Sequence, residues 1–313
     1  MKFSVGLQYE NPRFLEEILR DRDVIDEVYF SWGDMASGRG RAGVKSELPP
    51  WEAMDRQREV LRLLADAGIR MNLLFNAECY GAQSLSRDFF DRVGTVTDCV
   101  RTQYGLASVT TASPVIAKFL KMNFPGLPVR ASVNMEIGTA EAMEYLEDLF
   151  DGFYMKREYN RDLEHVRRMH EWCGRHGKKL YLLGNSGCLN FCPARHFHDN
   201  LVAHEEEIRR MDNAFAFEGL CRTFFAKPEN RERLPAVLNF IRPEDTARYE
   251  PYAAAIKLAT RVSRAPERIL RSFAEGKYAG DLLALLEPEH SIYPYVLENG
   301  DPPRLKKLEE DGV

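Results

Sequence analysis

Hydrophobic positions along the chain alternate between two periods. Short runs rich in β-branched and aromatic residues predict strands, and longer segments with apolar residues at helical spacing predict helices. Eight strands are predicted, at Lys2–Tyr9, Val24–Trp32, Arg70–Glu78, Ala107–Ala112, Val129–Ile137, Gly152–Arg157, Lys179–Asn185 and Ala253–Arg261. Helices are predicted between or after them at Phe14–Leu19, Trp51–Ala67, Ser86–Tyr104, Pro114–Met122, Thr139–Phe150, Asp162–His176 and Pro266–Tyr278.

Regular alternation of strands and helices indicates a parallel sheet. Eight such units are the number in a (β/α)8 TIM barrel. A doubly wound sheet would usually carry a glycine-rich phosphate turn after its first strand, and here that turn reads QYENPR. We therefore predict one barrel domain over residues 1–287, with a long insertion at 188–252 after the seventh strand and a C-terminal tail at 288–313.

The charge balance narrows the possible partners. The chain has 43 Lys and Arg against 48 Asp and Glu, so its formal net charge is −5. An exposed nucleic-acid track usually brings a basic excess, which makes nucleic acid an unlikely partner by expectation. No apolar run is long enough to cross a membrane, and the first residues do not resemble a signal peptide. We expect a cytoplasmic protein whose cysteines stay reduced.

Barrel topology sorts the six cysteines into two groups. All strands of a barrel point their C-terminal ends at one face, where catalytic groups collect. Cys99 and Cys173 lie late in predicted helices, near the opposite face. The other four follow the third strand, follow the seventh strand or lie in the insertion, and they are Cys79, Cys188, Cys192 and Cys221. Four thiols on the active face predict a metal site, and a thiolate set suits zinc or an iron–sulfur cluster.

Several motifs in the second half of the chain carry a family resemblance. Residues 184–193 read GNSGCLNFCP and are followed by Arg195 and by the sequence HDN at 198–200. The segment FIRPED at 240–245 precedes Tyr249, the sequence IKL at 256–258 and Arg261, and NAECYG at 76–81 ends the third strand. This pattern resembles the collagenase-like "unassigned peptidase" family over roughly residues 2–287, most specifically over 184–261.

The resemblance implies a TIM barrel with a four-cysteine [4Fe–4S] cluster. In this chain it places the cluster on Cys79, Cys188, Cys192 and Cys221. It also implies oxygen-independent hydroxylation, which better understood members perform on ubiquinone precursors, a tRNA uridine and an rRNA cytidine, with prephenate implicated as the oxygen donor. The RNA-modifying members have a long C-terminal extension that this chain lacks. We therefore expect a small molecule or a modified peptide as substrate.

Polar residues at the strand ends are the remaining site candidates, because a barrel keeps its chemistry there. His198, Glu136 and Lys257 are the candidate catalytic residues. Candidate substrate ligands are Arg157, Arg261, Asn76 and Asn185. Arginine can bind a carboxylate through two parallel hydrogen bonds, so Arg157 and Arg261 would suit a dicarboxylate such as prephenate.

Two other functions stay open at this point. The chain could be a non-catalytic iron–sulfur subunit of a heterodimer, or an electron carrier. It could also be a zinc-containing hydrolase or peptidase. The zinc-protease motif HExxH is incomplete at 204–208, which read HEEEI, and no G-x-S-x-G motif occurs. The sequence alone shows no nucleophile beside a base, so peptidase activity is the weaker expectation.

Overall fold

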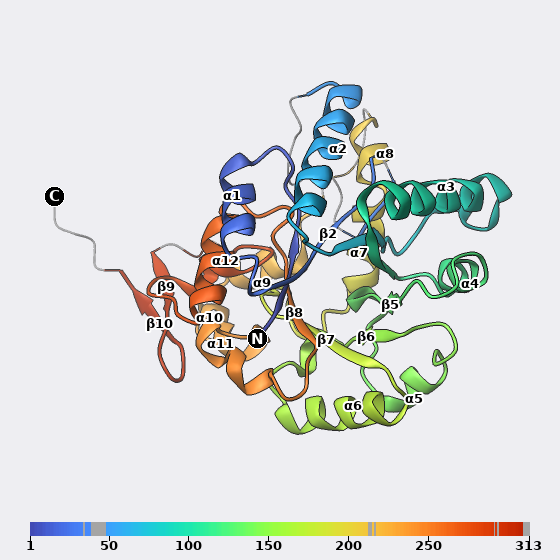
Figure 1. The fold of residues 1–313 in the computed structure, drawn as a ribbon. Coiled ribbons are helices and arrows are strands. Elements are labelled where there is room, and N and C mark those ends of the chain that lie inside the picture. The colour runs from blue at the N-terminus through green and yellow to red at the C-terminus, as the bar shows by residue number, and fades with distance from the viewer. Residues whose placement is uncertain are drawn as a thin grey trace.

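The computed structural model describes residues 1–33, 35–38, 48–211, 215, 217–290, 292 and 294–308. Eight parallel strands close into a barrel in their sequence order, so β1 pairs with both β2 and β8 (Figure 1). The strands are β1 Phe3–Gly6, β2 Ile25–Phe30, β3 Met71–Phe75, β4 Leu106–Thr111, β5 Val129–Ala131, β6 Gly152–Tyr154, β7 Lys179–Leu183 and β8 Ala255–Leu258. The predicted (β/α)8 barrel is confirmed.

Helices follow the strands, and a side chain caps the first turn of five of them. The barrel helices are α1 Pro12–Arg20, α2 Pro50–Asp66, α3 Arg87–Tyr104, α4 Pro114–Asn123, α5 Ala140–Glu144, α6 Leu163–Arg175 and α12 Pro266–Glu275. The side chains of Asn11, Ser86, Ser113, Thr139 and Asp162 each accept a hydrogen bond from a backbone N–H of the first turn. Such caps satisfy donors that a helix leaves unpaired at its start.

Most predicted strands are shorter in the structure, and two predicted elements, the fifth strand and the helix after it, end much earlier than expected. The fifth strand ends at Ala131, because Ser132 caps the 3₁₀ turn Val133–Met135 and Glu136 then adopts a φ of 50°. The helix predicted over Thr139–Phe150 stops at Glu144. Beyond it the backbone forms turns with hydrogen bonds between residues three apart. The N–H of Leu146 donates to the carbonyl of Met143, and the N–H of Leu149 donates to the carbonyl of Leu146. In both places local turn bonds replace the repeating pattern that the sequence predicts.

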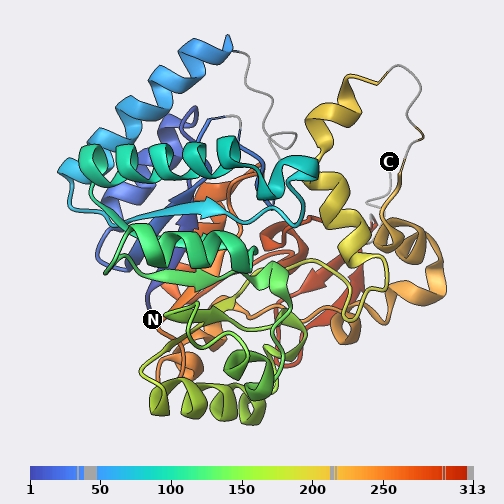
Figure 2. The ribbon, with the colours of Figure 1, turned by 90° about the vertical axis from the view of Figure 1, so that its right-hand side faces the viewer.

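The segment between β7 and β8 consists of short helices. They are α7 Arg195–Ala203, α8 Glu205–Arg209, α9 Leu220–Ala226, α10 Pro228–Arg231, α11 Leu234–Val237 and the 3₁₀ helix η5 Pro243–Tyr249. Figure 2 shows α7 and α8, drawn in yellow, at the end of the barrel toward which the strands point. After α12 follow the 3₁₀ helix η6 Leu282–Leu285 and the antiparallel pair β9 Tyr295–Glu298 and β10 Arg304–Lys307. None of the helices in the described ranges has the length and apolar character needed to span a membrane.

A charged pair crosses the inside of the barrel. Glu27 of β2 is fully buried, and its Oε1 lies 2.6 Å from Nη1 of Arg130 on β5. Because β2 and β5 are not neighbours, these side chains can meet only through the interior. Ser4 and Ser108 donate to the two carboxylate oxygens of Glu27, each at 3.2 Å, and the guanidinium of Arg130 lies 4.3 Å from the ring centre of Tyr181. The buried carboxylate is thus fully matched by partners from other strands.

Replacing Arg130 with Met would leave the buried Glu27 carboxylate without its cation. Loss of one partner of a buried ion pair typically costs about 3–5 kcal/mol, so we expect the free energy of unfolding to fall by that amount. Urea denaturation followed by circular dichroism measures it. The control is Arg56→Ala, which removes an exposed pair with Glu59 and should cost less than about 1 kcal/mol. Equal losses for the two variants would contradict this role for the interior pair.

Candidate active site

A pocket opens at the C-terminal end of the barrel, and we call it the mouth pocket. Four cationic side chains line it, against two carboxylates, Asp199 and Glu287. The cations are Arg157, Arg195, Lys257 and Arg261. Tyr29, Asn76, Asn134 and Leu183 complete much of the wall. This excess of positive charge in a recess favours a small anionic ligand.

Arg157 lies between the mouth pocket and the cysteines. It belongs to the 3₁₀ turn η4 Arg157–Tyr159 after β6 and is 5% exposed. Its Nη1 lies 3.7 Å from Sγ of Cys188. Its Nη2 is buried and has no hydrogen-bond partner among the described residues. A buried guanidinium donor without a partner is costly, so this N–H points to a ligand that accepts it.

Two other predicted substrate ligands also line the mouth pocket. Nη1 of Arg261 donates to Oγ of Ser37 at 2.9 Å, and Asn76 accepts from the backbone N–H of Gly38 at 3.0 Å. Gly6 makes the position of Arg261 possible, because a Cβ atom there would lie 2.5 Å from Cγ of Arg261. These contacts fix both side chains at the rim before any ligand binds.

Lys257 of β8 also lines the mouth pocket. It is 7% exposed, and its Nζ lies 4.0 Å from the ring centre of Tyr29 and 5.3 Å from that of Tyr154. Burial is the main cause that lowers the pKa of Lys257 to about 7. The positive charges of Arg261, Arg130 and Arg157 lower this pKa further, whereas the negative charge of Glu27 raises it. A large fraction of this amine is therefore neutral near pH 7.

Three cysteines gather in a second, smaller pocket beside the mouth, which we call the thiol pocket. Cys188, Cys192 and Cys221 line it together with His198, Asp199 and Pro288. Burial raises the pKa values of Cys192 and Cys221, and the neighbouring Cys188 raises both further. A bound cation would reverse this effect and stabilise the thiolates. With the side chains as they stand, no three Cys, His, Asp or Glu residues in the described ranges already form a metal-binding group.

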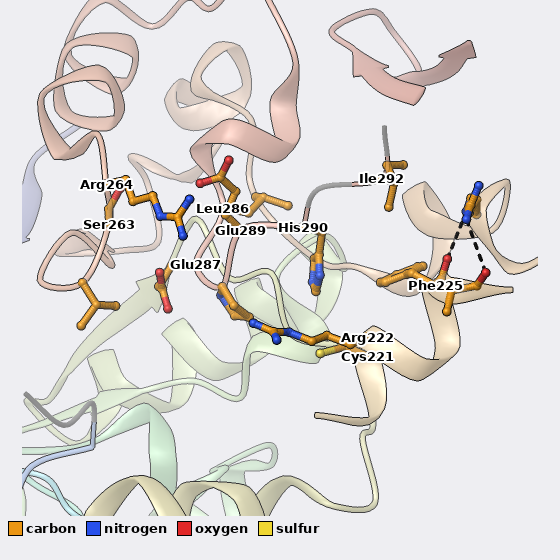
Figure 3. A pocket seen from close by; sticks show the side chains of 14 residues that line it. Cys221, Arg222, Phe225, Ser263, Arg264, Leu286, Glu287, Glu289, His290 and Ile292 are labelled. Carbon is orange, nitrogen blue, oxygen red and sulfur yellow. Dashed lines mark hydrogen bonds between the residues drawn. The ribbon is translucent and has the colours of Figure 1, made fainter. Parts of the chain in front are cut away.

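The two pockets adjoin each other and a third hollow. Arg195 and Asp199 line both the mouth and the thiol pocket. The third hollow, which we call the side groove, shares Cys221 and Pro288 with the thiol pocket and Val262 and Glu287 with the mouth. Figure 3 shows Cys221 and Arg222 on one side of the side groove, across from Arg264, Glu287 and Glu289. A ligand in the mouth would therefore lie next to the thiols.

Cys79 does not line the thiol pocket. Its sulfur accepts a hydrogen bond from the N–H of Gly81 at 3.3 Å and another from His204, at the end of α7. Nδ1 of His204 lies 3.0 Å from Oε2 of Glu207. The hydrogen bond to His204 is the main cause that lowers the pKa of Cys79, and the same bond raises the pKa of His204. This thiol–imidazole–carboxylate arrangement has no signal in the sequence, because its members come from the loop after β3 and from the distant insertion.

The remaining predicted residues lie in three different environments. His198 lines the thiol pocket, with its ring 5.5 Å from that of Phe217. Glu136 sits outside the mouth lining and is paired with Lys156 at 3.3 Å and with Nε of Arg195 at 3.2 Å. Asn185 is fully buried, accepts from the N–H of Ala259 at 2.7 Å and donates to the carbonyl of Leu285 at 2.9 Å. The catalytic and substrate-binding roles of these three residues stay predictions.

Comparison with known proteins supports the resemblance. No family model matches the chain. An uncharacterized protease of Methanocaldococcus jannaschii, MJ1657, is 24% identical over 279 residues, which cover 87% of this chain and 79% of that protein. The solved structure of the U32 peptidase Mk0906 matches 82% of this chain and 91% of its own, with 16% identity and a TM-score of 0.58. These matches support the chain's resemblance to the collagenase-like, or U32, peptidase family. At 16% identity, the match to Mk0906 shows a shared fold and nothing more.

The environment of Cys79 predicts a pH profile for alkylation. Thiolates react with iodoacetamide and thiols do not, so a lowered pKa lets Cys79 react at a lower pH than an ordinary cysteine. We expect the His204→Asn variant to need a higher pH for the same rate, because it loses the hydrogen bond that favours the thiolate. Peptide mass mapping across a pH series follows Cys79 separately from the other cysteines. Superimposable profiles for wild type and variant would contradict the pairing with His204.

Proposed function

We propose that this protein is an iron–sulfur enzyme that hydroxylates a small molecule or a modified peptide without molecular oxygen. A cluster held by Cys188, Cys192 and Cys221 would lie beside the mouth pocket, where a carboxylate-bearing molecule binds. The reaction class requires an oxygen donor of the form D–OH. The substrate R–H becomes R–OH and the donor becomes D–H, so two electrons pass from substrate to donor and no other oxidant is needed.

The donor set of the thiol pocket fits an iron–sulfur cluster. Cysteine thiolates are the usual ligands of such clusters, and hydrogen bonds to their sulfur atoms tune the reduction potential. Three thiols share this pocket, and Arg157 supplies an N–H near the sulfur of Cys188. A cluster held there would also supply the positive metal charge that stabilises the buried thiolates. The role of Cys79 as fourth ligand stays a prediction from the resemblance.

The position of Arg157 is the observation that supports this proposal most strongly. One of its nitrogens is near the sulfur of Cys188, and the other is buried in the mouth pocket region without a partner. A carboxylate that accepts from the second nitrogen would therefore be held one side chain away from the cluster. Arg261 provides a second guanidinium on the same wall, so a dicarboxylate such as prephenate could engage both. Asn76 and Lys257 would position the remainder of the molecule.

Iron and sulfide analysis of variants tests the cluster. After anaerobic reconstitution, wild type should hold about four iron and four sulfide per chain and absorb broadly near 400 nm. Ala at Cys188, Cys192 or Cys221 should remove most of the iron. Ala at Cys99 or Cys173, which lie outside the thiol pocket, should not. One zinc per chain in place of iron, or unchanged iron in all three pocket variants, would overturn the proposal.

A second candidate function is favoured by Cys79 and its partners. The peptidase names of the relatives and the arrangement of Cys79, His204 and Glu207 support hydrolysis of a peptide bond through a thioester. In that case His204 would protonate the leaving amine, and Glu207 would orient the imidazole. Peptide hydrolysis that is abolished in Cys79→Ala and persists in Cys192→Ala would assign this function. Hydrolysis unaffected by Cys79→Ala would exclude it.

A further inference from the structure

Lys257 is a buried amine that the proposed hydroxylation does not need as an acid or base. It lines the mouth pocket, close to the rings of Tyr29 and Tyr154 and near three guanidinium groups. The nearby carboxylate of Glu27 is already engaged by Arg130, Ser4 and Ser108. No carboxylate in the described part of the chain is ion-paired with Lys257. The lysine therefore lacks the partner that usually holds a buried ammonium in its charged form.

We propose that Lys257 forms a covalent imine with the carbonyl carbon of a 2-oxo acid bound in the mouth pocket. The inference rests on the proposed function in one respect, since it uses the same carboxylate site at Arg157. It adds a covalent bond to the ligand, because a 2-oxo acid carries its carbonyl group next to the carboxylate that Arg157 would hold. With the carboxylate on Arg157, the carbonyl would be held within the same small pocket as Nζ of Lys257.

The chemistry balances without any further reactant. The lone pair of the neutral amine forms a bond to the carbonyl carbon, and the carbonyl oxygen takes a proton to give a carbinolamine. Loss of that oxygen as water leaves the C=N bond, so one amine and one ketone give one imine and one water. Burial among guanidinium groups keeps enough of the amine neutral near pH 7 for the first step. The resulting imine, when protonated, withdraws electrons from the neighbouring carbon atoms.

Borohydride trapping tests this proposal. Borohydride reduces an imine to a secondary amine that survives digestion. Wild type incubated with phenylpyruvate and then reduced should gain one adduct per chain, and peptide mapping should place it on Lys257. The ketone phenylacetone, which lacks the carboxylate, should give far less adduct. Arg157→Met should lower the yield with phenylpyruvate severalfold, because the anchor for the carboxylate is lost.

The matched control is Lys156, which lies just after β6 and is paired with Glu136 at 3.3 Å. Lys156→Arg should trap phenylpyruvate as wild type does, and Lys257→Arg should not trap it. Wild-type mapping keeps the test decisive if the Lys257 variant folds poorly. An absent adduct, or adducts spread over exposed lysines to the same extent in both variants, would overturn the proposal.

The same experiment on Cys192→Ala separates this inference from the cluster. Cys192 lines the thiol pocket and not the mouth, so its loss should leave trapping unchanged. Trapping at Lys257 in a wild-type chain that takes up no iron on reconstitution would support the imine and reject the cluster. A reconstituted cluster in a wild-type chain that traps no phenylpyruvate would support the cluster and reject the imine.

Discussion

The ion pair between Glu27 and Arg130 sets the electrostatics of the whole barrel interior. A buried carboxylate must be matched where it lies, and this one is matched by a guanidinium from β5 and hydroxyls from β1 and β4. The bonds from β4 and β5 reach strands that do not neighbour β2, and so they help to fix how the barrel closes. They also pair the carboxylate of Glu27, so it is not available to the other cations. The cations above the pair, Lys257 among them, are left to face the mouth pocket.

The insertion after β7 completes the site that the barrel begins. Cys188 and Cys192 lie directly after β7, Cys221 lies on α9, and α7 brings Arg195 and Asp199 over the barrel end. The chain then returns after η6, where Glu287 and Pro288 form walls shared by neighbouring pockets. The thiols and the anion site therefore come from different segments, and Arg157 of η4 joins them. A loop-borne site on a rigid barrel is the usual arrangement of this architecture.

The sequence predicts the barrel well, because alternating strands and helices need only local patterns and a count of units. It also predicts that Cys188, Cys192 and Cys221 share a face, since topology alone places them there. It does not predict what each side chain contacts. The pairing of Cys79 with His204 and the ion pairs of Glu136 depend on the path of the insertion over the barrel end. The engagement of Asn185 by backbone groups depends on the segment after α12. None of these has a periodic signal in the sequence.

The central claim is that the thiol pocket and the mouth pocket form one site joined by Arg157. Electron paramagnetic resonance of the reduced, reconstituted protein tests it most directly, with and without saturating phenylpyruvate. The ligand should change the cluster signal in wild type, whereas Arg157→Met should keep the cluster but lose this change. An unchanged wild-type spectrum, with binding of the ligand confirmed by calorimetry, would contradict it.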